Sequence, residues 1–102
     1  SLIVLVLGAG GKSGILCAAE AKRAGAARVV GVESHEPYAA DLRALGICDE
    51  VISGDARDAA AMCALALAAN GGREYDVSFS CVNVEGTEMS AILPVSDVVV
   101  VL

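Results

Sequence analysis

The chain has 102 residues, which is enough for one domain with a hydrophobic core. Hydrophobic residues make up 56% of it and aromatic residues only 3%, so the core must be built from Val, Ile, Leu and Ala. That composition suits a parallel sheet enclosed by helices. The formal net charge of −6 argues against nucleic acid and anionic membrane surfaces as partners.

The cysteines and the apolar runs indicate the compartment. Cys17, Cys48, Cys63 and Cys81 form no Cys-x-x-Cys pair, so we predict no metal site. We expect them to act as small buried hydrophobes in a reducing environment. No apolar run reaches the roughly 18–20 residues that span a bilayer, and no signal-peptide pattern is present. The prediction is a cytoplasmic protein without a membrane segment.

Both ends of the chain have the composition of strands. Residue 2 already lies in a predicted strand, and the chain closes on the apolar run 98–102. We therefore expect residues 1–102 to be a dinucleotide-binding domain cut from a longer polypeptide, with the substrate domain not included.

A glycine-rich loop dominates the first third of the chain. The apolar run 2–7 predicts a strand buried on both faces, and a helix follows the loop and ends at Gly25. Between them stand Gly8, Gly10, Gly11 and Gly14. Free N–H groups at a helix N-terminus attract phosphate, and the helix dipole adds roughly 0.3–1 kcal/mol. Glycine lets the backbone approach a diphosphate closely, so we predict a dinucleotide there.

The spacing of the loop leaves alternatives. In the G-x-G-x-x-G pattern the third glycine is replaced by Ser13, whereas G-x-x-G-x-x-G fits at positions 8, 11 and 14. A Walker A loop would use Lys12 and Ser13, but its first glycine position holds Val6. A glycine-rich turn without a ligand is the third interpretation. We favour the dinucleotide, with Lys12 and Ser13 adding hydrogen bonds to phosphate, and a solvated loop lysine is an equal alternative for Lys12.

The second predicted strand, residues 28–33, ends in Glu33, which stands 19 residues after Gly14. At that distance an acidic side chain accepts hydrogen bonds from the adenosine ribose. A carboxylate also repels the 2′-phosphate of NADP, so NAD is the expected cofactor and NADP the less favoured one. A solvated strand-end glutamate is the alternative. Ser34 and His35 follow and are further candidates for cofactor contact. A helix N-cap is the alternative for Ser34, and a solvated loop histidine is the more common alternative for His35.

The next helices are read from their apolar stripes. Tyr38, Leu42 and Leu45 predict the packing face of a helix that Gly46 ends. Met62 and Leu65 predict the packing face of an alanine-rich helix over residues 56–69.

Two further loops contribute candidate site residues. After the short strand 50–53, Asp55 would reach the adenine amine or cap the following helix, and Ala56 stands beside it. The fourth strand, 75–82, ends in Val82 and Asn83, which we expect to line the ligand cleft beside the first strand's loop. Plain turn chemistry is the alternative for Asn83. A short helix over 87–93 and a strand from Asp97 complete the chain.

These elements alternate as strand and helix throughout. The order predicts an α/β fold, a doubly wound parallel sheet of about five strands with helices on both faces, which is Rossmann-like.

Three stretches resemble the cofactor domain of the medium-chain dehydrogenase/reductase superfamily: residues 4–14, the Gly-Val-Glu run 31–33 and the Leu-x-x-Leu-Gly run 42–46. Within it, the loop 8–14 and the runs 81–84 and 87–90 resemble the 3,5-diaminohexanoate dehydrogenase family. That resemblance implies NAD(P)-dependent oxidative deamination of 3,5-diaminohexanoate to 5-amino-3-oxohexanoate in lysine fermentation. Loop 8–14 would bind the diphosphate, Glu33 the ribose, and the region 82–84 would line the nicotinamide cleft.

The resemblance also implies what lies outside the segment. The substrate is small and amino-acid-like, the full-length protein is expected to be a homo-oligomer, and the catalytic groups should lie in the second domain, so none is assigned here. A nucleotide-sensing regulatory module of the same fold is an alternative, which flanking membrane spans would favour. A methyltransferase normally has an acidic residue just ahead of its glycine turn, where this chain has Leu7.

Overall fold

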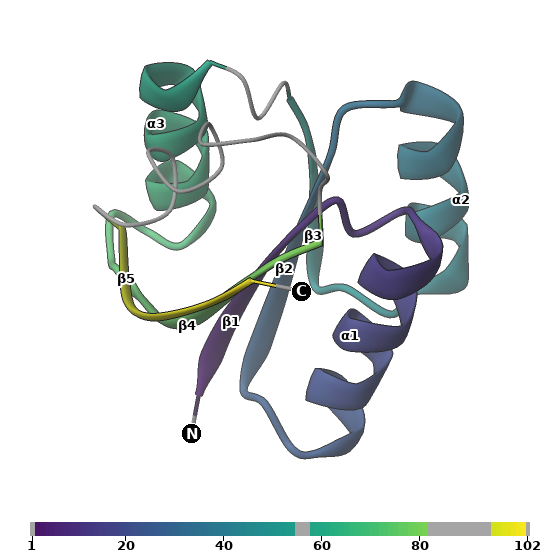
Figure 1. Cartoon of the computed structure of the whole chain (residues 1–102), viewed down its shortest axis with the longest axis horizontal. Helices are drawn as coiled ribbons and strands as arrows, with labels where there is room; N and C mark the ends of the chain where they lie inside the picture. Colours follow the sequence, from purple (N-terminus) through teal and green to yellow (C-terminus); the bar gives the residue numbers. More distant parts are fainter. Residues whose placement is uncertain (1, 55–57, 82–94, 102) are drawn as a thin grey trace.

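The computed structural model describes residues 2–54, 58–81 and 95–101, apart from the side chains of residues 59 and 101. They form a parallel sheet with strand order β3-β2-β1-β4-β5 (Figure 1). The elements are β1 (Ile3–Leu7), α1 (Lys12–Arg23), β2 (Arg28–Glu33), α2 (Glu36–Leu45), β3 (Glu50–Ser53), α3 (Ala59–Ala69), β4 (Tyr75–Ser80) and β5 (Ser96–Val101). The predicted fold class is confirmed.

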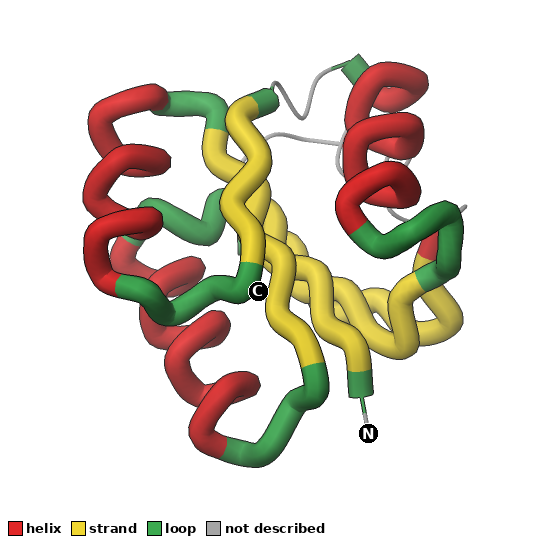
Figure 2. Tube along the Cα trace, turned by 180° about the vertical axis from the view of Figure 1, so that it is seen from behind, coloured by secondary structure: helices red, strands yellow, loops and turns green. Residues whose placement is uncertain are grey.

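Helices cover both faces of the sheet. In Figure 1, α1 and α2 lie on one side and α3 on the other, and Figure 2 shows the same separation from behind. The central strand β1 serves both layers because its side chains alternate. Leu5 and Leu7 join the core beneath α3, whereas Val4 and Val6 join the core beneath α1 and α2. None of the described helices is both long and apolar enough to cross a membrane.

α1 sits unusually close to the loop that leads into it. A Cβ on Gly14 would stand 2.0 Å from the carbonyl oxygen of Gly8 and 2.6 Å from the Cα of Ala9. Both neighbours are backbone atoms, so neither can move aside as a flexible side chain would. The helix therefore reaches its position only because residue 14 has no side chain.

α2 packs through only one residue of its predicted stripe, Leu42, together with Ala39. Ala39 and Leu42 are fully buried, whereas Tyr38 is 49% exposed and Leu45 57% exposed, so the prediction was wrong for these two. The helix lies close over Gly31, where a Cβ would stand 3.2 Å from Leu42 Cδ2. Leu42 therefore packs where Gly31 leaves room for it, and Tyr38 lies on the exposed side of the helix.

The helix starts also differ from the prediction. The N-cap of α2 is His35 and not Ser34, and it makes no side-chain cap. The N-cap of α3 is Asp58, whose Oδ1 accepts a hydrogen bond from the N–H of Ala61 at 3.1 Å. On α3, Met62 is buried as expected, but Leu65 is 41% exposed. The buried partner of Met62 is Ala66, one helical turn on.

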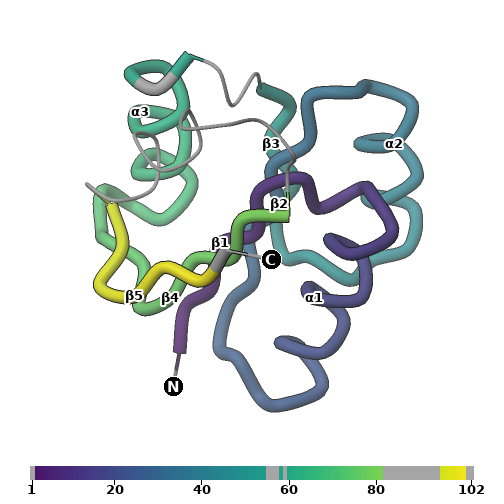
Figure 3. The backbone as a smooth tube through the Cα atoms, viewed as in Figure 1, coloured from purple at the N-terminus to yellow at the C-terminus, as the bar shows by residue number. Residues whose placement is uncertain are grey.

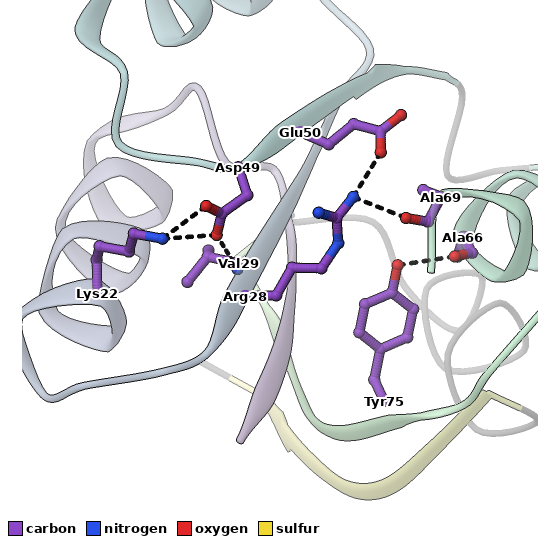
Figure 4. Close-up of polar contacts among 8 residues, drawn as sticks. All are labelled: Lys22, Arg28, Val29, Asp49, Glu50, Ala66, Ala69 and Tyr75. Atoms are coloured by element: carbon purple, nitrogen blue, oxygen red, sulfur yellow. Dashed lines mark hydrogen bonds and ion pairs between the residues drawn. The ribbon is translucent and has the colours of Figure 1, made fainter. Parts of the chain in front are cut away.

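A polar network fastens the amino ends of the strands (Figure 4). Lys22 Nζ donates to both oxygens of Asp49 at 2.7 Å, and the N–H of Val29 donates to the same carboxylate at 2.7 Å. Nearby, Arg28 donates to Glu50 at 2.8 Å. Two more bonds tie this end to α3: Arg28 to the carbonyl of Ala69 at 2.9 Å, and the Tyr75 hydroxyl to that of Ala66 at 2.7 Å.

The close approach at Gly14 predicts a contrast between two glycines of one loop. Gly14→Ala should lower the free energy of unfolding by at least about 2 kcal/mol, because the new methyl group overlaps backbone. Gly11→Ala should cost less than about 1 kcal/mol, since its Cβ would have Gly8 O at 3.6 Å as nearest atom. Urea denaturation measures both, and equal losses would contradict the packing argument.

The contacts of Asp49 predict how the free energy of unfolding changes at acid pH. Burial opposes its charge, but the hydrogen bonds from Lys22 and Val29 outweigh it and hold the pKa of Asp49 below its ordinary 3.8. Its stabilising effect is therefore full above that value and is lost as the pH falls through the lower folded pKa. We expect Asp49→Asn to be less stable at neutral pH and to lose less stability between about pH 6 and pH 3. Denaturation across that range tests this, with Asp41→Asn, an exposed carboxylate of α2, as the control.

Candidate functional site

The glycine loop is held against the end of β2. The N–H groups of Gly8 and Ala9 both donate to the carbonyl oxygen of Val32, at 2.8 and 3.0 Å, and Gly8 adopts a φ of 72° that favours glycine. The N–H of Gly11 then donates to Gly8 O at 3.2 Å and closes the turn. Figure 3 follows the backbone from β1 through this turn into α1. The turn thus delivers the start of α1 to the carboxyl edge of the sheet.

The first turn of α1 is open to an anion. The helix begins at Lys12, and its N-cap, Gly11, has no side chain to cap it. The N–H groups of Lys12, Ser13 and Gly14 cannot bond within the helix, and none has a partner among the described residues. The first turn also contains no acidic residue. These three donors, together with the helix dipole, favour a negatively charged group.

Gly10 and Gly11 are glycine for different reasons. A Cβ on Gly10 would lie 2.8 Å from both Glu33 Oε1 and Tyr38 Cβ, so the protein's own packing excludes one. At Gly11 the φ of −78° suits any residue, and no described atom comes nearer to a Cβ than 3.6 Å. The protein itself does not require glycine at position 11. The bare backbone there faces the space in front of the helix start.

Glu33 lies directly beside this loop. Its side chain comes from the end of β2 and is only 7% exposed. Oε1 accepts from the N–H of Gly10 at 2.8 Å, and Oε2 accepts from the N–H of His35 at 3.0 Å. No cation pairs with it among the described residues. The structure therefore brings Glu33 and the glycine loop together, with the carboxylate oriented by two backbone donors.

The residues after Glu33 form the outer rim of the site. Ser34 and His35 are exposed. The ring of His35 meets that of Tyr38 edge to face, with centroids 4.5 Å apart and an interplanar angle of 81°. The sequence pattern predicted a core position for Tyr38, whereas the structure places its half-exposed ring beside His35.

The remaining predicted site residues, Asp55, Ala56, Val82 and Asn83, lie outside the described part of the chain. Their assignments stay predictions. Up to residue 81 the structure agrees with the expected placement of the fourth strand. The N–H of Cys81 donates to Leu7 O at 3.0 Å, so the end of β4 lies beside the end of β1.

Two of the thiols, those of Cys17 and Cys48, are poorly suited to metal binding or catalysis. Burial, reinforced by the neighbouring Cys81, raises the pKa of Cys17 to about 11. Burial likewise raises the pKa of Cys48 to about 11. A thiol with such a pKa carries little thiolate at neutral pH, and thiolate is the form that binds metal. Within the described ranges, no three His, Cys, Asp or Glu side chains are grouped as a metal site.

Comparison with known proteins gives a consistent result at the sequence level. No protein-family model matches the chain. It is 52% identical over 94 residues to L-erythro-3,5-diaminohexanoate dehydrogenase of Acetoanaerobium sticklandii, covering 90% of this chain and 27% of that protein. It is 42% identical over 96 residues to the enzyme of the same name from Fusobacterium nucleatum, covering 92% of this chain and 28% of that protein. The chain thus spans little more than a quarter of the length of these relatives.

Solved structures agree on the fold. AibC superposes with a TM-score of 0.76 at 28% identity, over 100% of this chain and 30% of that one. A mycobacterial protein, Rv1454c, solved in complex with NADPH, superposes with a TM-score of 0.75 at 23% identity, over 94% of this chain and 28% of that one. The resemblance read from the sequence is confirmed: the chain has the fold of the cofactor domain of medium-chain dehydrogenases/reductases and is similar in sequence to L-erythro-3,5-diaminohexanoate dehydrogenase.

Proposed function

We propose that this chain binds a nicotinamide dinucleotide as the cofactor domain of an NAD(P)-dependent dehydrogenase acting on an amino group. One observation carries the proposal: the uncapped first turn of α1 lies beside a buried carboxylate that is bonded to the same loop. The names of the curated relatives and the NADPH in a structural neighbour support it.

The diphosphate fits the open helix start. The chain is acidic overall, so bulk charge cannot attract phosphate. The N–H groups of Lys12, Ser13 and Gly14 supply local donors instead, and the absence of a side chain at Gly11 lets the ligand approach them. The side chains of Lys12 and Ser13 are exposed at the same turn and would add hydrogen bonds of about 1–3 kcal/mol each.

The ribose fits Glu33. Each oxygen of this carboxylate already accepts one backbone N–H and retains acceptor capacity for a hydroxyl. A 2′-phosphate at the same place would meet an unpaired negative charge. Arg43, a cation of the neighbouring helix, is engaged with Glu36 at 3.1 Å. We therefore propose NAD as the preferred cofactor, with Ser34 and His35 at the rim of the adenosine site.

The reaction proposed for the full-length protein follows that of the named relatives. The bound nicotinamide would accept a hydride from the amine-bearing carbon of 3,5-diaminohexanoate, and hydrolysis of the imine would yield 5-amino-3-oxohexanoate and ammonia. The contribution of this chain is to bind and orient the cofactor. The proposal places the catalytic groups in a second domain, in a cytoplasmic homo-oligomer that takes a small, amino-acid-like substrate.

Titration with NADH tests cofactor binding. Fluorescence enhancement of NADH on the wild-type protein should saturate. Gly11→Val should raise the Kd tenfold or more, roughly 1.4 kcal/mol, because its side chain would occupy the space in front of the helix start. Ala40→Val, which adds bulk on the exposed side of α2, should bind as the wild type does. Saturation in none of the three proteins would exclude the proposed function.

The ratio of NADPH to NADH affinity tests Glu33. Removing the carboxylate in Glu33→Ala should weaken NADH binding and relieve the repulsion of the 2′-phosphate. The preference for NADH should therefore fall about tenfold or more. Glu74→Ala removes an exposed carboxylate just before β4, at the opposite end of the sheet, and should leave the ratio unchanged. Thermal melting of both variants separates specificity from loss of fold. An unaltered ratio of the two affinities in Glu33→Ala would show that residue 33 does not contact the ribose.

A further inference from the structure

Two thiols meet between α1 and the end of β4. The sulfur of Cys81 accepts a hydrogen bond from the Cys17 thiol. The alternation of a strand explains this meeting, because Val77 and Phe79 face the core beneath α1 and α2, and Cys81, two residues further on, packs against the same core. Cys17 reaches that core from α1. Neither thiol belongs to the cofactor site described above.

Small molecules can reach this pair of thiols from solvent. Both side chains are half-buried. Cys17 also lines a largely apolar surface pocket of about 550 Å³, together with Leu16, Ala21 and Phe79. A pocket of this kind admits a small uncharged oxidant such as hydrogen peroxide.

The two thiols differ in what controls their acidity. Burial raises the pKa of Cys81, and the hydrogen bond from Cys17 opposes that rise. For Cys17, burial, the charge of Cys81 and the shared hydrogen bond all raise the pKa, to about 11. Cys81 is therefore the thiol that loses its proton first, and Cys17 keeps its proton. Because burial raises both pKa values, we expect the pair to react slowly at neutral pH.

We propose that Cys17 and Cys81 are a site of oxidation by peroxide, at which a disulfide reversibly ties α1 to the end of β4. First, the Cys81 thiolate attacks one peroxide oxygen, the O–O bond breaks, and a sulfenic acid and hydroxide form. Then the Cys17 sulfur attacks the Cys81 sulfur, the S–O bond breaks, and water leaves as the S–S bond forms. In sum, two thiols and one hydrogen peroxide give one disulfide and two waters. A dithiol reductant reverses the bond.

The place of the pair in the fold gives the disulfide a consequence. Cys17 lies one turn beyond Gly14, on the helix whose first turn is open to an anion. Cys81 is bonded through its N–H to Leu7 O at 3.0 Å, at the end of the central strand. The disulfide would fasten this helix to the sheet and close a long loop of the unfolded chain. We expect the melting temperature to rise by about 5 °C or more on oxidation.

Peptide mapping after treatment with hydrogen peroxide tests the pairing. Remaining thiols are alkylated, and the protein is digested with trypsin without reduction. The four cysteines then fall on four different peptides, because cleavage occurs after Lys12, Lys22, Arg43, Arg57 and Arg73. We expect the peptide 13–22 linked to the peptide that begins at residue 74. Dithiothreitol should release both peptides and reverse the rise in melting temperature.

Single variants show whether the effect belongs to this pair. Cys17→Ala and Cys81→Ala should lose both the linked peptide and the peroxide-dependent rise in melting temperature. Cys48→Ala, the matched control, should keep both. Melting of the reduced proteins shows which variants fold, and the mapping of the wild type needs none of them.

Two results would overturn the inference. One is a wild-type protein in which peroxide leaves Cys17 and Cys81 unlinked, with Cys81 ending as a sulfinic or sulfonic acid. The other is a linked wild type with an unchanged melting temperature. The inference rests on the contact between the thiols and not on cofactor binding, so a failure to bind NADH would contradict the proposed function alone. In a reducing compartment such a disulfide is transient and senses oxidation.

Discussion

The contact between Gly14 and the carbonyl of Gly8 positions everything else at this edge of the sheet. Because no Cβ stands between them, α1 starts immediately beyond the end of β1. Its unbonded N–H groups then face the same space as the end of β2. A helix displaced by even one methyl group would carry those donors away from the carboxylate of Glu33. The site is therefore formed mainly by the close approach of backbone segments, and side chains make the smaller contribution.

Parallel pairing of β1 with β2 turns two distant stretches of sequence into one site. Leu7 pairs with Val32, so β1 and β2 end at the same edge of the sheet. The carbonyl of Val32 accepts two N–H groups from the loop, and the next residue, Glu33, accepts a third from Gly10. Loop and carboxylate thus orient each other before any ligand arrives. This arrangement reduces the ordering that a ligand must impose.

The sequence predicted the features that depend on pattern and failed on those that depend on close packing. Continuous apolar runs identified the buried strands, and the spacing between Gly14 and Glu33 anticipated that the two regions would meet. An apolar stripe could not reveal that Ala39 is buried while Tyr38 and Leu45 are exposed, because which face of α2 meets the sheet is a tertiary property. The hydrogen bond from Gly10 to Glu33 was likewise invisible without coordinates. Tyr38 lies beside Gly10, so its exposed position is a feature that only the fold reveals.

The amino and carboxyl ends of the strands have different roles. The ion pairs of Lys22 with Asp49 and of Arg28 with Glu50 fasten the amino ends, well away from the glycine loop. Rim residues such as Ser34 and His35 have no part in that network. Substitutions at these rim positions therefore leave the fastening of the scaffold intact. The edge that carries the glycine loop can diverge in sequence independently of the edge that holds the strands together.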